Sequence, residues 1–270
     1  MQIIMPDEVA SATPDPCAAA QLDGERNTLI ALNTETIVHP LFTNCVPPHR
    51  KLQKVSTMLQ IDLYTEITCP WCLIGQHRLD KLLRERFPDL AVRIEHHPVL
   101  LMPNAPASGL YIPDLLRQRY GITDPKSAFA RPEAEARASG LDLDLRRQPY
   151  AYPTQAAHAL IMAARERGTQ HSLAVAFSQA YFLEGKNIAD AKVLATLAAA
   201  NGFSRDEALA IADNKHWHAR ATQAAAASAE AGIRSVPHFV FGNKVEINGG
   251  RSEIEIASAI TTALANVPAE

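Results

Sequence analysis

The sequence has little cysteine, no excess of charge of one sign and no long apolar run. Four cysteines in 270 residues are too few for a secreted fold stapled by disulfides. The 26 basic and 29 acidic residues nearly balance, which argues against a nucleic-acid-binding surface or a polybasic membrane patch. No stretch approaches the roughly 20 apolar residues that a membrane-spanning helix needs. We therefore expect neither a nucleic-acid partner nor a membrane partner.

The start of the chain lacks a secretory signal, since it has neither a basic beginning nor a continuous apolar block. We therefore expect the cytoplasm, where a close cysteine pair is more often catalytic or metal-binding than structural. Residues 1–57 hold scattered prolines and no sustained hydrophobic period. We predict a poorly ordered extension there, followed by a single domain over residues 58–270.

Strand patterns lie at the two ends of that domain. Residues 59–65 alternate and predict a strand, a helical pattern runs from Pro70 to Pro88, and residues 91–97 predict a second strand. Residues 237–241 and 244–247 predict two strands joined by a two-residue turn, and Ser252 with Glu255 forms a capping box for a last helix. The order strand-helix-strand, then strand-strand-helix, predicts a small mixed sheet of the α/β thioredoxin-like fold.

A helical interval separates these two units. Helices are expected over residues 114–120, 154–167, 172–183, 191–201, 205–213 and 216–231, where alanine and leucine are abundant. Prolines divide residues 121–153 into short pieces without a clear assignment. We therefore predict a large all-helical insertion at about residues 105–231.

Two of the four cysteines, Cys69 and Cys72, surround Pro70 and Trp71 where the first strand gives way to a helix. At a helix N-cap, free N–H groups and the helix dipole stabilise negative charge, which lowers a cysteine pKa from about 8.5. Pro70 suits the first helical position, since its missing N–H would have no partner there. Cys72 lies one turn on, more shielded, where it can close a ring. The spacing predicts a thiol–disulfide exchange pair.

Two other interpretations of this pair stay open. A Cys-x-x-Cys pair is half of many zinc sites, but no second pair occurs in the sequence, so we expect no metal. The pair could also be incidental on a core helix, although the carboxyl end of a strand is where open α/β sheets place their sites.

Three motifs then carry a family resemblance: CPWCLIGQHRL at residues 69–79, YFLEGKNIADAKVLATLAAANG at 181–202, and the run Gly-Ile-x-Ser-Val-Pro-x-Phe that ends at Phe239. With them the chain resembles the DsbA-like thioredoxin family, in particular its FrnE-type branch. That branch is related to 2-hydroxychromene-2-carboxylate isomerases and kappa-class glutathione transferases. The resemblance implies a cis peptide bond between Val236 and Pro237 that faces Cys69 and receives the substrate. It also implies that Cys69 is the nucleophile and Cys72 the resolving thiol.

Three further residues are candidates near the pair. Trp71 is expected to shape the rim of the thiol site. His238 could donate to the Cys69 thiolate, although a strand histidine turned into the helical insertion is slightly favoured. Glu66 could take up the proton of Cys72, although an exposed glutamate at a strand end is the commoner case.

The predicted function is dithiol–disulfide exchange by an enzyme without a cofactor other than its redox-active disulfide. The expected partner is a thiol or disulfide substrate, protein or small molecule, and a homodimer is left open. The alternative is a glutathione-dependent isomerase or transferase on the same fold, with glutathione as co-substrate. The related isomerases and transferases usually have serine at the first active position, so the two cysteines favour redox work. A non-catalytic binding module is a third hypothesis.

Overall fold

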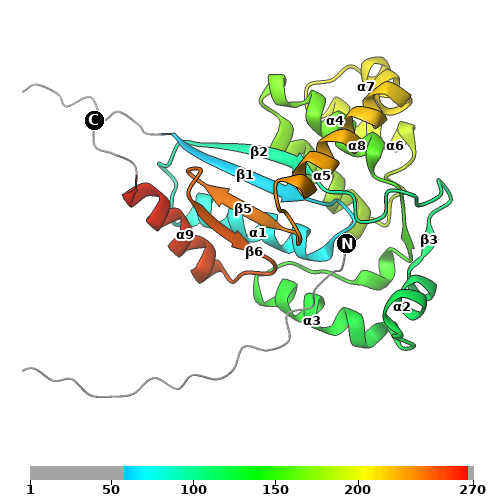
Figure 1. Cartoon of the computed structure of the whole chain (residues 1–270), viewed down its shortest axis with the longest axis horizontal. Coiled ribbons are helices and arrows are strands. Elements are labelled where there is room, and N and C mark those ends of the chain that lie inside the picture. Colours follow the sequence, from blue (N-terminus) through cyan, green and yellow to red (C-terminus); the bar gives the residue numbers. More distant parts are fainter. Residues whose placement is uncertain (1–57, 267–270) are drawn as a thin grey trace, which may run out of the picture. The chain divides into compact units, whose positions relative to one another are not determined.

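The computed structural model of the chain describes residues 58–266, so the predicted extension over residues 1–57 lies outside the described residues. A four-stranded sheet has the order β2-β1-β5-β6 (Figure 1). Its strands are β1 (Leu59–Thr65), β2 (Val92–Pro98), β5 (His238–Phe241) and β6 (Val245–Asn248). Strand β1 pairs with β2 in parallel and with β5 antiparallel, and β5 pairs antiparallel with β6. The sheet is therefore mixed, as the strand patterns predict.

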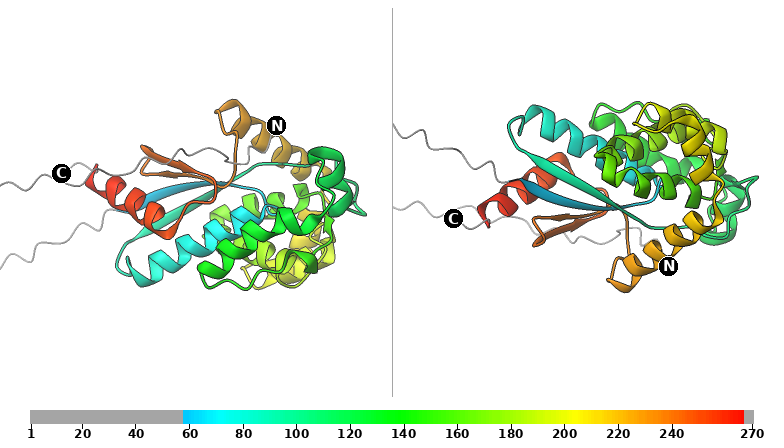
Figure 2. Two further views of the ribbon diagram at one scale, coloured as in Figure 1. Left: turned by 90° about the horizontal axis from the view of Figure 1, so that it is seen from below. Right: turned by 90° about the horizontal axis from the view of Figure 1, so that it is seen from above.

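Helices α1 (Pro70–Glu85) and α9 (Glu253–Ala265) cover one face of this sheet, and α8 (Lys215–Glu230) lies on the other side (Figure 2). Alternation along the strands decides which side chains meet the first two helices. The shared core contains Leu59, Ile61, Leu63, Leu79, Leu82, Phe239, Phe241, Ile256 and Ile260. This core fixes α1 against the sheet and so positions the beginning of that helix.

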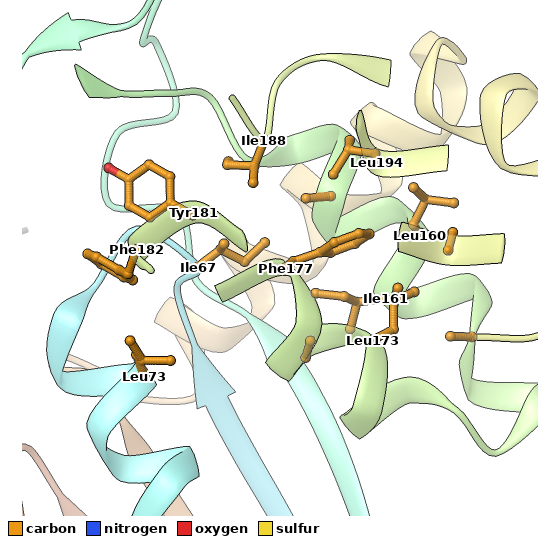
Figure 3. Packing of buried hydrophobic residues seen from close by; sticks show 14 of the residues in the cluster. Ile67, Leu73, Leu160, Ile161, Leu173, Phe177, Tyr181, Phe182, Ile188 and Leu194 are labelled. Atoms are coloured by element: carbon orange, nitrogen blue, oxygen red, sulfur yellow. The ribbon is translucent and has the colours of Figure 1, made fainter. Parts of the chain in front are cut away.

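The segment between β2 and β5 is mainly helical. Its elements are β3 (Leu110–Tyr111), α2 (Ile112–Tyr120), α3 (Pro125–Ala138), the 3-10 turn Leu145–Arg147, β4 (Tyr150–Ala151), α4 (Gln155–Ala163), the 3-10 turn Arg165–Arg167, α5 (Gln170–Phe182), α6 (Ala191–Ala199), α7 (Arg205–Ala212) and α8. A second core holds them together, and Ile67 and Leu73 extend it to the beginning of α1 (Figure 3). The two cores therefore meet at the thiol pair.

Helix α3 corrects the prediction for residues 121–153. The prolines do not divide this region into short pieces, because α3 runs for 14 residues with Pro132 inside it. Asp124 caps the helix by accepting from the Lys126 N–H, and Pro125 occupies the first turn, where proline is tolerated. Proline at position 132 removes one backbone hydrogen bond, and burial of Pro132 and Ala136 offsets that loss.

Within residues 58–266, none of the helices combines the length and the apolar character that crossing a bilayer requires.

Candidate active site

The thiol pair lies at the beginning of α1. Cys69 is the N-cap residue in an extended conformation, and Pro70 follows in the first turn. The N–H of Cys72 donates to the Cys69 carbonyl at 3.0 Å, which closes the turn and places the two residues on one side. Both cysteines are free thiols, with Cys69 6% exposed and Cys72 fully buried. The outer sulfur is thus the one that a substrate can reach.

The two sulfurs have opposite electrostatic environments. The thiol of Cys72 donates a hydrogen bond to the Cys69 sulfur, and together with the N–H groups of Trp71 and Cys72 this lowers the pKa of Cys69, although burial opposes the shift. Burial, followed by that same hydrogen bond, raises the pKa of Cys72 well above its ordinary value. The arrangement favours a thiolate on Cys69 and a protonated thiol on Cys72.

The loop before β5 faces the outer sulfur. The Val236–Pro237 peptide bond is cis, and the Cys69 Sγ lies 3.9 Å from the Val236 carbonyl oxygen. The Pro237 carbonyl accepts a hydrogen bond from the Gly249 N–H at 2.8 Å. Helix α1 comes close because Gly75 has no side chain, since a Cβ there would lie 3.1 Å from Pro237 Cγ. The loop and the thiol pair therefore form one surface.

Trp71 forms one side of that surface. Its half-buried indole lies directly on the backbone of Gly250, where an added Cβ would be 2.3 Å from the Trp71 Cε3 atom. The guanidinium of Arg131, from α3, lies 5.4 Å from the centre of the Trp71 ring and makes a cation–π contact with it. Trp71 is therefore held between the segment after β6 and the helical segment.

Glu66 corrects an expectation, because it is buried and not an exposed strand-end residue. It is only 1% exposed, and its carboxylate accepts from the Leu101 N–H at 3.0 Å and from the Thr154 hydroxyl at 3.1 Å. Its backbone N–H donates to the Cys72 Sγ at 3.5 Å. The negative charge of Glu66 raises the pKa of both cysteines, as a lesser contribution than hydrogen bonding and burial. A carboxylate thus lies beneath the thiol pair.

His238 lies on β5, and its contacts are with strands, not with the helical insertion. Its ring meets Tyr64 of β1 edge-on, with 5.7 Å between ring centres, and its Nε2 lies 3.4 Å from the Glu246 Oε2 atom. Burial lowers its pKa, while the Glu246 charge acts in the opposite direction. Phe239, the next residue, belongs to the core under α1 and α9, so alternation directs the His238 side chain to the opposite face.

A metal-compatible cluster lies elsewhere on the sheet. In the described part of the chain, Asp62, Glu95 and His97 bring potential ligand atoms within 4.8 Å of one another. His97 Nε2 already lies 2.8 Å from Asp62 Oδ1, and Glu95 forms an ion pair with Arg165. Neither Cys69 nor Cys72 belongs to this cluster, so its three side chains do not complete a zinc site on the cysteine pair.

The sequence analysis missed His158 and Thr154, which meet Glu66 from α4. His158 is 2% exposed, and its Nε2 lies 3.6 Å from Glu66 Oε1. The only signal in the sequence is a histidine inside an apolar helical pattern, AAHALIMAA at residues 156–164, which indicates burial but names no partner.

Comparison with known proteins identifies the family and the fold. Residues 60–261 match the DsbA-like thioredoxin domain, which covers most of the chain. The fold and the paired thiols define a thioredoxin-like protein of the oxidoreductase class, so the predicted fold class is confirmed. This chain belongs to the DsbA-like thioredoxin family. No curated protein matches the sequence.

Solved structures show the same fold. A probable DsbA oxidoreductase from Streptomyces coelicolor is 25% identical, with a TM-score of 0.69 over 78% of this chain and 93% of that one. A 2-hydroxychromene-2-carboxylate isomerase is 14% identical, with a TM-score of 0.57 over 76% and 96%. The cytosolic disulfide reductase DsbM from Pseudomonas aeruginosa, solved with glutathione, is 18% identical, with a TM-score of 0.53 over 76% and 99%.

Proposed function

We propose that this chain is a dithiol–disulfide oxidoreductase in which Cys69 is the nucleophile and Cys72 the resolving thiol. The observation that carries the proposal is the position of two free thiols within one turn at the beginning of α1, with the outer sulfur 3.9 Å from the Val236 carbonyl oxygen. The lowered pKa of Cys69 and the raised pKa of Cys72 support it. An exchange enzyme needs one thiolate to attack and one protonated thiol held in reserve. Membership of an oxidoreductase family supports the same function.

The reaction transfers two electrons from the dithiol to a substrate disulfide. The Cys69 thiolate attacks one substrate sulfur, the substrate S–S bond breaks, and the departing thiolate takes a proton. Cys72 then loses its proton and attacks the Cys69 sulfur of the mixed disulfide, which releases the second substrate sulfur as a thiolate. The enzyme ends as a Cys69–Cys72 disulfide, and the reverse sequence oxidises a substrate dithiol.

The substrate would lie along the surface formed by Val236, Pro237 and Trp71. The Val236 carbonyl oxygen lies 3.9 Å from the Cys69 sulfur. An extended chain beside a backbone edge can add main-chain hydrogen bonds, which suits a protein or peptide disulfide. Glu66 lies on the inner side of the pair, where it could take part in proton transfer to and from Cys72. A tuning role for His238 stays a prediction.

The second candidate is a glutathione-dependent isomerase or transferase on the same fold, with Cys69 holding glutathione. The observation in its favour is the shared fold with the isomerase and with DsbM, the latter solved with glutathione. Retention of a free second thiol beside Cys69 favours redox exchange, because isomerisation does not need a resolving sulfur. The cytoplasm remains the expected compartment, and a homodimer remains open.

One experiment distinguishes the two functions. It uses a variant in which Cys17 and Cys45 are replaced by serine, so that only Cys69 and Cys72 can react. The protein is equilibrated with reduced and oxidised glutathione, and the fraction of Cys69–Cys72 disulfide is measured after acid quenching. We expect a reversible two-electron transition, and a protein-bound mixed disulfide that accumulates in Cys72→Ala. The matched Cys69→Ser variant should form none. A stable glutathione adduct with turnover of a small aromatic compound would instead favour the isomerase, and no exchange at all would favour a binding module.

A further inference from the structure

A buried histidine–carboxylate pair lies beneath the thiols, and the exchange chemistry described above assigns no role to its histidine. His158 and Glu66 are 2% and 1% exposed, and His158 Nε2 lies 3.6 Å from Glu66 Oε1. Within residues 58–266 this Nε2 atom has no hydrogen-bond partner, although it is fully enclosed. Most buried polar atoms in proteins do have a partner, so an enclosed one next to a carboxylate needs an explanation.

Three hydrogen-bond donors surround the Glu66 side chain, an arrangement that suits an ionised carboxylate. The Leu101 N–H, the Thr154 hydroxyl and the Thr68 N–H, at 3.0, 3.1 and 3.4 Å, all point hydrogen atoms at its two oxygens. Thr154 is the N-cap residue of α4, so the positive end of that helix also faces the carboxylate. All three contacts are stronger when the acceptor is an ionised carboxylate, because a charged acceptor strengthens a hydrogen bond.

The dithiol state adds a second negative charge to the same buried region. The Glu66 backbone donates to Cys72, and the Glu66 charge opposes ionisation of Cys69. When Cys69 is a thiolate, two like charges therefore share an interior where a charge is costly unless it is paired. Oxidation to the disulfide removes the thiolate and leaves Glu66 alone. The need for a nearby cation thus depends on the redox state.

His158 is the group placed to supply that cation. Of the other titratable groups here, His96 from β2 lies near His158, and Tyr181 from α5 lies near Glu66. Burial holds the pKa of His96 well below and that of Tyr181 well above their ordinary values, so both stay neutral near pH 7. The buried faces of α6, α7 and α8 that pack around α4 consist of apolar side chains and one serine, Ser228, which donates to the Pro98 carbonyl.

We infer that His158 gains a proton when the Cys69–Cys72 disulfide is reduced and gives it up when the disulfide reforms. This inference rests on the proposed function. With glutathione as reductant, the disulfide and two glutathione thiols give oxidised glutathione, the Cys69 thiolate, the protonated Cys72 thiol and the His158 imidazolium. Two protons leave glutathione and two are bound by the protein, so atoms and charge balance without proton release. His158 acts through Glu66 and touches neither sulfur, so it is a positioning residue.

The proton count has a measurable consequence. The equilibrium constant with glutathione should be nearly independent of pH between the pKa of Cys69 and about pH 8, where glutathione remains a thiol. Without a titratable group at position 158, the reaction releases one proton. The constant should then rise tenfold per pH unit, which corresponds to about 30 mV in the potential of a two-electron couple.

The test compares His158→Gln with the unchanged protein in glutathione buffers from pH 6 to 8, with Cys69 ionisation followed by thiolate absorbance. His77→Gln is the matched control, because His77 lies on α1 and its Nε2 lies 3.0 Å from the Ser139 carbonyl oxygen. We expect a flat constant in the unchanged protein and in His77→Gln, and a tenfold rise per unit in His158→Gln. Equal slopes in all three would overturn the inference while leaving the exchange function intact. No exchange in the unchanged protein would overturn the function itself.

A second measurement needs no substitution and so does not depend on the variant folding. Nitrogen NMR of the histidine rings in the unchanged chain, with the His158 signal assigned by its absence in His158→Gln or by through-bond correlation, reports the charge of the imidazole in each redox state. We expect an imidazolium in the reduced protein and a neutral ring in the oxidised protein at pH 7. A neutral ring in both states, or a charged ring in both, would contradict the inference.

Discussion

Two helices begin beside the thiol site, and their first residues are used differently. Helix α1 begins at Cys69, whose sulfur faces the N–H groups of Trp71 and Cys72 and lies beside the Val236 carbonyl. Helix α4 begins at Thr154, whose hydroxyl binds Glu66 and not its own helix. The first therefore presents a sulfur that can react, whereas the second holds a carboxylate that cannot leave. At both helix beginnings the positive end of the helix faces a negative group, but only the sulfur of Cys69 reacts in the proposed exchange.

The largest effect is expected when the buried carboxylate of Glu66 is removed. In Glu66→Leu, the Leu101 N–H and the Thr154 hydroxyl lose their acceptor inside the protein. Each buried donor left without a partner costs roughly 1–3 kcal/mol, so we expect the loss of both contacts to lower the free energy of unfolding by about 2–6 kcal/mol. Denaturant unfolding of the oxidised protein measures this. The isosteric Glu66→Gln should lose less than half as much, and equal losses in both variants would contradict the hydrogen-bond explanation.

The reactivity of the Cys69 thiol tests the environment at the beginning of α1. A free cysteine is roughly 3% thiolate at pH 7, because its pKa is about 8.5. Since the pKa of Cys69 is lowered, we expect its alkylation at pH 7 to be up to roughly tenfold faster than that of free cysteine, and Cys72 to react much more slowly. Mass spectrometry of timed alkylation separates the two sites. Comparable rates at Cys69 and Cys72 would show that the sulfurs are not polarised.

The same shifts predict how stability depends on pH in the reduced protein. Between the lowered pKa of Cys69 and the ordinary thiol value of 9.0, the unfolded chain binds more protons, so stability should rise with pH. Above 9.0 the raised pKa of Cys72 reverses the sign, and stability should fall. The oxidised protein has neither thiol and serves as the control. A rise of the same size in the oxidised protein would assign the effect to other groups.

A smaller effect is expected at the rim of the thiol site. In Gly250→Ala, the new Cβ would lie 2.3 Å from Trp71 Cε3, so the indole has to move away from the segment after β6. We expect a change in tryptophan emission and a loss of a few-fold in kcat/KM for a peptide disulfide, with the Cys69 pKa unchanged. The matched test is a double-mutant cycle, because Gly250→Ala should add little once Trp71→Ala is present. Full additivity would place the effect elsewhere.

Local signals were enough to predict the sheet and the thiol pair. Strand β1 has the predicted bounds, and the Ser252–Glu255 capping box opens α9 as expected, because alternation and capping depend on neighbours along the chain. Helix α3 was not predicted because proline usually ends a helix. The burial of Pro132 depends on tertiary packing, which the local sequence does not give. Glu66 and His158 lie in segments far apart in the sequence, and nothing in either segment names the other as a partner. Their contact could only be found in the folded chain.

The smallest effect concerns His238, which tests whether the thiol end is electrically separate from the opposite face of the sheet. The ring of His238 contacts Tyr64 and Glu246, whereas the Cys69 sulfur faces the Val236 carbonyl two residues earlier. Phenylalanine keeps the ring and removes the titratable nitrogens. We therefore expect His238→Phe to change the Cys69 pKa, measured by thiolate absorbance, by less than about 0.3 units, since burial lowers the pKa of His238 and its ring contacts Tyr64 and Glu246 instead of the thiol. A larger shift would mean that His238 tunes the thiolate through the cis-proline loop. The thiol site and the opposite face of the sheet would then be electrostatically coupled.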